Sequence, residues 1–275
     1  MSTLSVSLKK PAFSLYSSKQ RYKLMKVVMV GAGNVATILG RLISQNNHVI
    51  SQVISRNINH ARELADRFGA TYTDFAGEFD LTADLFIIAT TDASLTDNFA
   101  NFQTGNKLVV HTAGSVSRDV LQKMSSNYGV LYPLQSLRKE LEEIPPIPFL
   151  VDGNNDGTRV WLKEFAQTLS DNVSEATDEE RLKLHTAAVI VSNFTNHLYA
   201  IAEDFCGKEH VNFDLLKPLI METAHRIQHA SPMEVQTGPA VRKDIHTLDK
   251  HLRTLSTHPK LRTTYMRLTD SIMNP

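Results

Sequence analysis

The chain has 275 residues, is 42% hydrophobic, and balances 29 lysines and arginines with 29 acidic residues, so its formal net charge is zero. This length and apolar content can fill one large domain or two ordinary ones, and a neutral chain has no overall positive field for nucleic acid or an anionic membrane. A single cysteine excludes an internal disulfide framework. No stretch is apolar for long enough to suggest a membrane span. We expect a soluble, cytoplasmic globular protein that binds neither nucleic acid nor a membrane.

Residues 1–24 differ from the rest of the chain. They are rich in serine and lysine and contain no acidic residue, the first of which is Glu63. This composition predicts a flexible tail, either as an unstructured extension or as the product of an upstream start codon with Met25 as the functional beginning. An organellar transit peptide would share the same basic, serine-rich character.

From Met25 onward, short β-branched runs alternate with helical stretches. Strands are expected at 26–30, 48–55, 70–73, 83–90, 107–112 and 129–133, with helices at 35–46, 59–68, 93–101 and 117–126. A proline-punctuated crossover then leads to a strand near 149–151 and a helix at 158–170. Apolar strands that are each followed by a helix predict a parallel sheet covered on both faces. We therefore expect an α/β fold over residues 25–176, with a doubly wound, mostly parallel sheet of the Rossmann type.

The remaining residues, 177–275, carry no convincing strand. Thr177 can cap a helix together with Glu180, and apolar residues then recur at helical spacing as far as Phe205. Further helices are expected near 215–227, 245–255 and 261–272. The chain is thus predicted to end in an all-helical domain.

The segment "GAGNVA", residues 31–36, lies between the first strand and the first helix. A side chain at Gly31 or Gly33 would obstruct a pyrophosphate that approaches the backbone, and the helix that opens at Asn34 offers unpaired amide groups to negative charge. Tight strand-to-helix turns also select glycine, so a bare turn is the alternative. The position in a repeated strand–helix unit favours a dinucleotide site formed by Gly31, Ala32, Gly33, Asn34 and Val35.

The residues at the end of the second strand determine whether the site prefers NAD or NADP. Enzymes that prefer NAD usually place an acidic side chain here to hold the ribose hydroxyls, whereas this chain has Ser55, Arg56 and Asn57. A guanidinium can grip a 2'-phosphate with paired hydrogen bonds, and the two neighbours can add donors. The sequence therefore predicts NADP as the cofactor. The alternative is that Arg56 is simply a solvated charge at the start of the next helix.

Two further strand ends are expected at the same edge of the sheet, where ligands of open parallel sheets bind. The candidate neighbours of the nicotinamide ribose and of the substrate are Thr90, Thr91, Asp92, His111, Thr112 and Gly114. Some of the polar residues in these turns could instead cap the helices that follow.

Several segments together resemble a family of Rossmann-like proteins whose C-terminal helical domain has no assigned function. They are "GAGNVA", "VVHTAGSVS", "GVLYPLQSL", "LHTAAVIVSNF" and "TGPAVRKDIHTLDKHL". That family is similar to pyrroline-5-carboxylate reductase and to deazaflavin-dependent NADP reductases. It is more distantly similar to hydroxyacid dehydrogenases, and its helical domain resembles the C-terminal domain of 6-phosphogluconate dehydrogenase. The resemblance implies a pocket between two domains and a homodimer built through the helices.

The resemblance also points to residues that orient a substrate. Hydroxyacid dehydrogenases carry a lysine on the long helix, where this chain has Ser192 followed by Asn196, so a lysine-driven mechanism is doubtful. Ser192, Asn193 and Asn196 either line a cleft or find partners in the core. Arg242 is expected to clamp a substrate carboxylate or phosphate, held in place by Asp244. The alternative is an ordinary surface ion pair between these two residues.

Two histidines are candidates for proton transfer, His111 and His185, since imidazole titrates near neutrality; either could instead be structural. His225 and His229 are spaced for chelation but have no obvious third ligand, so no metal is expected.

Together these features predict an NADP-dependent oxidoreductase that moves hydride between nicotinamide and a small carbonyl or imine substrate. The alternative is a non-catalytic NADP-binding sensor or scaffold dimer, because the fold alone does not decide between the two.

Overall fold

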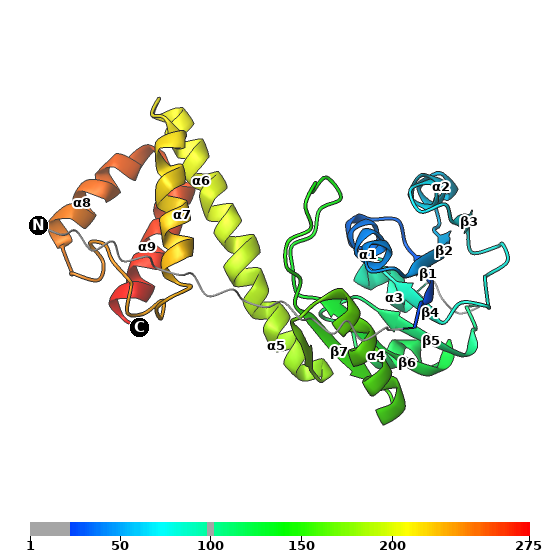
Figure 1. The fold of residues 1–275 in the computed structure, drawn as a ribbon. Helices are drawn as coiled ribbons and strands as arrows, with labels where there is room; N and C mark the ends of the chain where they lie inside the picture. The colour runs from blue at the N-terminus through cyan, green and yellow to red at the C-terminus, as the bar shows by residue number, and fades with distance from the viewer. Residues whose placement is uncertain (1–22, 98–101) are drawn as a thin grey trace, which may run out of the picture. The chain divides into compact units, whose positions relative to one another are not determined.

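The computed structural model describes residues 23–97 and 102–275. The predicted tail, residues 1–24, lies outside this range apart from its last two residues. The chain divides into two compact units, unit 1 (Met1–Thr186) and unit 2 (Ala187–Pro275) (Figure 1). The division falls inside a helix, α5 (Asp178–Ala188). It lies C-terminal to the boundary expected after residue 176, which is close to the start of this helix.

Unit 1 contains an eight-stranded sheet in the order β3-β2-β1-β4-β5-β6-β7-β8. Its strands are β1 (Lys26–Val30), β2 (Val49–Ile54), β3 (Thr71–Thr73), β4 (Leu85–Ile88), β5 (Gly105–His111), β6 (Ser125–Pro133), β7 (Phe149–Gly153) and β8 (Val173–Glu175). Among the described strands, β6 and β7 pair antiparallel and the other neighbours pair parallel. The strand order reverses between β1 and β4, which is where a doubly wound sheet opens a ligand crevice. The predicted fold class is confirmed.

Helices cover both faces of this sheet, as the continuous apolar strands require. One buried cluster joins the strands to α1 (Asn34–Gln45), α2 (Ile58–Asp66) and α4 (Asp156–Leu169). A second cluster joins the opposite face to α3 (Asp92–Asp97) and to a short 3-10 helix, η1 (Arg118–Leu121). Within β1, Val27 and Met29 point into the first cluster, and Val28 and Val30 into the second. The sheet, packed on both faces, therefore holds the loops at its carboxyl edge in fixed positions.

One expectation for unit 1 is wrong, one strand was missed, and another expectation is only partly covered. The helix predicted at 117–126 is only η1, because strand β6 already begins at Ser125, whose hydroxyl donates to the carbonyls of Gly105 and Lys107 on the neighbouring strand. Strand β8 was not predicted, since three polar-flanked residues carry too little pattern. The end of the helix predicted at 93–101 lies outside the described residues.

Helix α5 begins with the predicted capping box. The Thr177 hydroxyl accepts from the Glu180 amide at 3.3 Å, and the Glu180 carboxylate accepts from the Thr177 amide at 2.9 Å. The helical run continues through a π-helical segment, Val189–Phe194, into α6 (Thr195–Lys208) of unit 2.

Unit 2 is built from helices, and all of its residues are described. After α6 come α7 (Lys217–Arg226), α8 (Ile245–Thr254) and α9 (Pro259–Met273), with 3-10 turns at Phe213–Leu216 and Leu255–Thr257. No helix in the described part of the chain has the length and apolar character needed to cross a membrane.

Candidate functional site

The glycine loop follows β1 and opens α1. Gly31 has φ +118°, a left-handed backbone conformation that favours glycine, and its amide donates to the Ile54 carbonyl at 2.7 Å. Gly33 is the N-cap of α1 and provides no side-chain cap, so the first amides of the helix keep their free hydrogen-bonding capacity. The loop therefore presents bare backbone and a helix N-terminus to the space above it.

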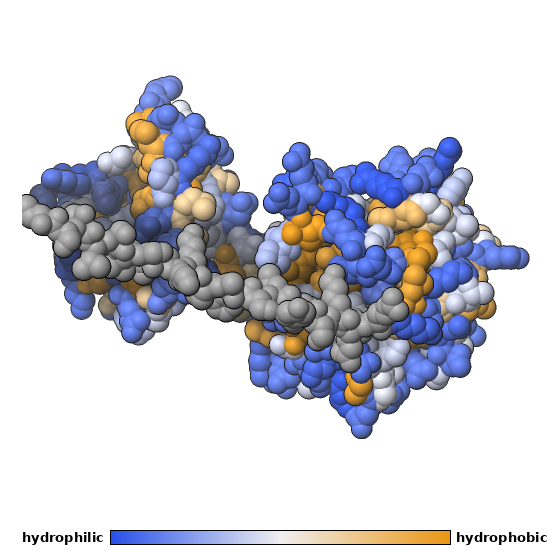
Figure 2. Space-filling view, in the orientation of Figure 1, coloured by the Kyte–Doolittle hydropathy of each residue, from blue (hydrophilic) through white to orange (hydrophobic). Residues whose placement is uncertain are grey.

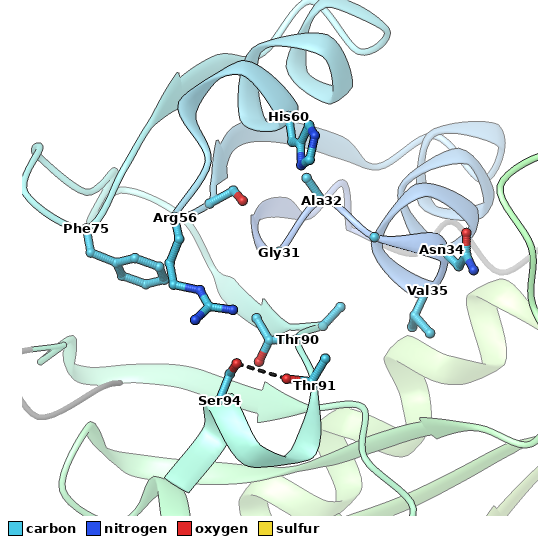
Figure 3. A pocket seen from close by; sticks show the side chains of 13 residues that line it. Gly31, Ala32, Asn34, Val35, Arg56, His60, Phe75, Thr90, Thr91 and Ser94 are labelled. Atoms are coloured by element: carbon cyan, nitrogen blue, oxygen red, sulfur yellow. Dashed lines mark hydrogen bonds between the residues drawn. The ribbon is translucent and has the colours of Figure 1, made fainter. Parts of the chain in front are cut away.

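A pocket of about 340 Å³ lies above this loop (Figure 3). Its lining residues are Gly31, Ala32, Gly33, Asn34, Val35, Ser55, Arg56, His60, Phe75, Ala89, Thr90, Thr91 and Ser94. The lining joins the glycine loop to the carboxyl ends of β2 and β4, the position expected for a dinucleotide. None of the described residues in this lining is acidic.

The β2 side of the pocket is basic. Arg56 extends from the end of β2 into the pocket beside the Phe75 ring, and His60 points from α2 toward Ala32 (Figure 3). Arg56 forms no ion pair with another described residue, so its guanidinium is available for an anionic ligand. His60 and Phe75 were not predicted from the sequence. His60 lies in the first turn of α2, directly after the loop that carries Arg56, and this position was the signal available for it.

The residues of this pocket fit NADP. Gly31 and Gly33 allow close approach of a pyrophosphate, and Arg56 with Ser55 can hold a 2'-phosphate without repulsion from an acid. The hydroxyl oxygen of Thr90 is buried and has no hydrogen-bond partner among the described residues. A buried hydroxyl without a partner is costly, which is consistent with a polar ligand in this pocket.

Five predicted cofactor residues do not line this pocket. The Asn57 side chain caps α2 by accepting from the amides of Asn59 and His60, at 3.0 and 3.3 Å. The Asp92 carboxylate accepts a short hydrogen bond from the Ser115 hydroxyl. The other three, which lie at the end of β5, are His111, Thr112 and Gly114, and all are buried.

His111 is fully enclosed at the end of β5. Its Nδ1 accepts from the Ala113 amide at 3.1 Å. Burial, and secondarily the Arg181 cation, lower the pKa of His111 to about 4, against the opposing effect of the Ser117 backbone. The ring is therefore neutral near pH 7, with its proton on Nε2.

His185 of α5 lies beside the same strand end. Its Nδ1 is 2.9 Å from the hydroxyl of Tyr132, at the end of β6, and the two rings meet edge to face. Gly114 makes this approach possible, because a Cβ at that position would lie 2.6 Å from the His185 Nδ1. His185 and Gly114 were expected at the site from the sequence, whereas Tyr132 has the pattern of an ordinary strand residue.

Arg181 is the largest charged side chain in the interior of unit 1, with 1% exposure. Its Nη2 donates to the Val116 carbonyl at 2.5 Å and to the Asp178 carboxylate at 2.7 Å. Its Nε and Nη1 have no partner among the described residues. Nothing in "TDEERL" distinguishes this arginine from a solvated one, so the sequence could not reveal it.

The predicted substrate residues of unit 2 are accessible. Ser192 and Asn193 lie in the π-helical segment and Asn196 in the first turn of α6, and none of the three side chains bonds to another described residue. π-helical turns are frequent at functional sites. Arg242 is exposed, and among the described residues it forms no close ion pair with Asp244, whose carboxylate caps α8 through Thr247 at 2.7 and 3.1 Å. The Thr247 hydrogen bonds, and secondarily the Arg242 charge, lower the pKa of Asp244.

The histidines spaced for chelation have no third possible ligand near them among the described residues. The rings of His225 and His229 lie 4.9 Å apart, and no group of three possible ligands occurs among the described residues.

Two family models match the chain. Residues 26–114 match the model described as NADP oxidoreductase coenzyme F420-dependent, and residues 147–272 match a domain of unknown function, DUF2520. No curated protein matches the chain.

Solved structures extend the similarity over nearly the whole chain. The "putative NADP oxidoreductase BF3122" from Bacteroides fragilis is 37% identical, with a TM-score of 0.84 over 92% of this chain and 99% of its own. A 1-pyrroline-5-carboxylate reductase from Streptococcus pyogenes is 11% identical, with a TM-score of 0.60 over 92% and 99%. A reductive aminase from Aspergillus terreus, in complex with NADPH and ethyl-5-oxohexanoate, is 15% identical, with a TM-score of 0.63 over 90% and 95%. The last two share the fold.

Proposed function

The chain belongs to the NADP oxidoreductase family that includes the Bacteroides fragilis protein, and from this we propose that it catalyses hydride transfer between NADP and a small carbonyl or imine substrate. NADP supplies or accepts the hydride when bound. The observation that carries the proposal is the pocket above the glycine loop, which is lined by Arg56 and His60 and by no acid among the described residues.

The cofactor contacts follow from that lining. Gly31 to Val35 would hold the pyrophosphate through backbone amides, and Ser55, Arg56 and His60 would hold the 2'-phosphate. Thr90 and Thr91 lie at the end of β4, on the path toward the nicotinamide end. Asp92 would act indirectly, by fixing Ser115 and thereby the turn after β5.

Of the two candidate histidines, His185 fits proton transfer better. His111 is fully buried and is held neutral by its surroundings, so it cannot exchange a proton with solvent. His185 is partly exposed, and its Nε2 bonds to no other described residue. We assign the proton exchange with substrate to His185. His111, together with Thr112 and Gly114, would support the end of β5.

The substrate class rests on the site and on the shared fold. Ser192, Asn193 and Asn196 offer hydroxyl and amide groups with free hydrogen-bonding capacity, and Arg242 offers an exposed guanidinium for an acidic substrate group. The reductive aminase of the same fold was solved with a keto ester. A small carbonyl or imine compound with polar substituents fits these groups.

We also propose that the protein is a homodimer joined through unit 2. Its buried apolar residues are only Cys206, Ala240, Leu248 and Leu255, whereas fifteen large apolar side chains of unit 2 are exposed. Several of these lie on α7 and the turn before it, and Figure 2 shows apolar residues on the surface of this unit. The apolar surface buried inside unit 2 is too small to stabilise a unit of this size. A second copy of the chain would offer a matching apolar surface against which the exposed residues can pack.

The proposed activity is tested with NADPH deuterated at C4 and a panel of keto acids, aldehydes and cyclic imines. We expect loss of the nicotinamide absorbance with one class and deuterium at the reduced carbon of the product. Tight NADPH binding without turnover on any class would favour a sensor or scaffold.

A further inference from the structure

We propose that Tyr132 is a positioning residue that holds the His185 ring through Nδ1, so that Nε2 faces the substrate and donates the proton during reduction. The inference rests on the proposed hydride transfer and adds a residue that neither the family models nor the sequence pattern assign to the reaction.

The contact itself is specific. The Tyr132 hydroxyl and the His185 Nδ1 are 2.9 Å apart, within the range of a good hydrogen bond, and the ring planes are inclined at 77°. Tyr132 as a whole is 8% exposed, and its hydrogen bond with His185 is partly buried. The hydrogen bond therefore fixes which nitrogen of the imidazole remains free.

The backbone around the pair is arranged to allow the contact. A Cβ on Gly114 would lie 2.6 Å from the His185 Nδ1 and 3.0 Å from the Tyr132 Cζ. Only a residue without a side chain leaves the two rings in place. Because Gly114 belongs to the turn after β5, the pair lies at the carboxyl edge of the sheet, where substrates of such sheets react.

Two further contacts fix α5 against this turn. Arg181 of α5 donates to the Val116 carbonyl, and the Asp178 carboxylate of the same helix accepts from the Arg118 amide at 3.3 Å. These contacts hold His185 in place along the sheet edge, and the hydrogen bond from the Tyr132 hydroxyl restricts the rotation of its ring.

The proposal assigns the tyrosine hydroxyl as the donor to Nδ1 of the neutral ring, which leaves the proton on Nε2. In the cation both nitrogens carry a proton, and Nδ1–H donates to the tyrosine oxygen. During reduction, hydride bonds to the substrate carbon and the π electrons of the C=O or C=N bond move to the heteroatom. The heteroatom takes the Nε2 proton of the cationic ring, which becomes neutral and is reprotonated from solvent.

The first test needs no substrate. In isotope-labelled protein, the ring-nitrogen NMR shifts of neutral His185 are expected to report the tautomer with the proton on Nε2. Tyr132→Phe should convert this signal to a mixture of tautomers, because Nδ1 loses its donor. Tyr128→Phe is the matched control, since it removes a hydroxyl from the same strand that contacts only Asp119 among the described residues. An unchanged tautomer in Tyr132→Phe would overturn the proposal.

The second test uses the substrate class that the deuteride panel identifies. His185→Gln is expected to lower kcat about 100-fold, a typical contribution of a positioned acid. Tyr132→Phe is expected to lower kcat about tenfold with the KM values unchanged, and to have no further effect in the His185→Gln background. Independent, additive effects of the two substitutions, or a change in KM alone, would contradict a positioning role.

The two levels of failure are distinguishable. If the wild-type protein reduces a substrate and the Tyr132→Phe and His185→Gln variants do so at the same rate, the positioning proposal fails and the proposed function stands. If the wild-type protein binds NADPH and reduces no member of the panel, the proposed function fails and the proton role fails with it.

Discussion

The carbonyl oxygen of Ala89, at the end of β4, closes the space beside Gly31 at the end of β1. A Cβ on Gly31 would lie 2.2 Å from that oxygen. The glycine loop is therefore seated directly against the neighbouring strand, and its backbone can face the pocket only because Gly31 has no side chain.

Replacing Gly31 with alanine should damage both the fold and cofactor binding. The clash with Ala89 and the left-handed φ angle together are expected to lower the free energy of unfolding by roughly 3 kcal/mol. Gly33→Ala is the matched control, because its Cβ would meet no atom within 4 Å. That variant should keep its unfolding temperature but bind NADPH more weakly, since the methyl group stands where the pyrophosphate approaches. Equal melting temperatures for the two variants would refute this description of the loop.

Arg56→Gln should weaken NADPH binding and spare NADH. A charge-assisted bond to a phosphate is lost, which corresponds to about a 10- to 100-fold rise in the Kd of NADPH. NADH has no 2'-phosphate and should bind the variant as it binds the wild type. Arg62→Gln, on the same β2–α2 segment but paired with Asp66 outside the pocket, is the control and should change neither Kd. Parallel losses for both nucleotides would mean that Arg56 does not contact the 2'-phosphate.

Stability should fall on acidification below about pH 6.5, the ordinary pKa of histidine. Burial lowers the pKa of His48 and lowers that of His111 to about 4 in the folded protein. Between pH 6.5 and pH 4, His111 binds a proton in the unfolded chain and not in the folded chain. The stabilisation is therefore complete above pH 6.5 and is lost as the pH falls. For His111 alone, the free energy of unfolding should decrease by roughly 2 kcal/mol from pH 7.5 to pH 5.

Urea denaturation at a series of pH values measures this effect. His111→Gln should flatten the pH dependence while lowering the stability at every pH. A slope that stays the same in the variant would show that the pKa of His111 is the same in the folded and the unfolded chain.

Leu219→Glu should separate the proposed dimer. Leu219 lies on α7 with 60% exposure, and a carboxylate placed in an apolar interface must be desolvated or excluded. Sedimentation at micromolar concentration should show a dimer for the wild type and a monomer for this variant. Val160→Glu, at a similarly exposed apolar site on α4 of unit 1, should remain a dimer. A monomeric wild type would rule out the interface.

Much of unit 1 could be predicted because its signals are local. A continuous apolar strand followed at once by Gly31 and a helix specifies the crevice, and the absence of an acid near Arg56 specifies the cofactor, without knowledge of distant contacts. The failed helix at 117–126 shows the limit of the same approach: pairing of Ser125 with the neighbouring strand outweighs a weak helical pattern.

The second half of the site depends on contacts that periodicity cannot encode. Tyr132 and His185 are separated by 53 residues, and each has an ordinary place in its own element. The burial of Arg181 likewise follows only from the docking of α5 on the turn after β5. The Asp244 side chain was expected to hold Arg242, and in the structure its hydrogen bonds go to Thr247 as a helix cap.

Calorimetric titration of the purified protein with NADPH and NADH tests the central claim most directly. We expect NADPH to bind at least about tenfold more tightly than NADH, with the difference carried by the 2'-phosphate contact at Arg56. Equal affinity for the two nucleotides, or no heat with either, would contradict the assignment of the glycine-loop pocket as an NADP site.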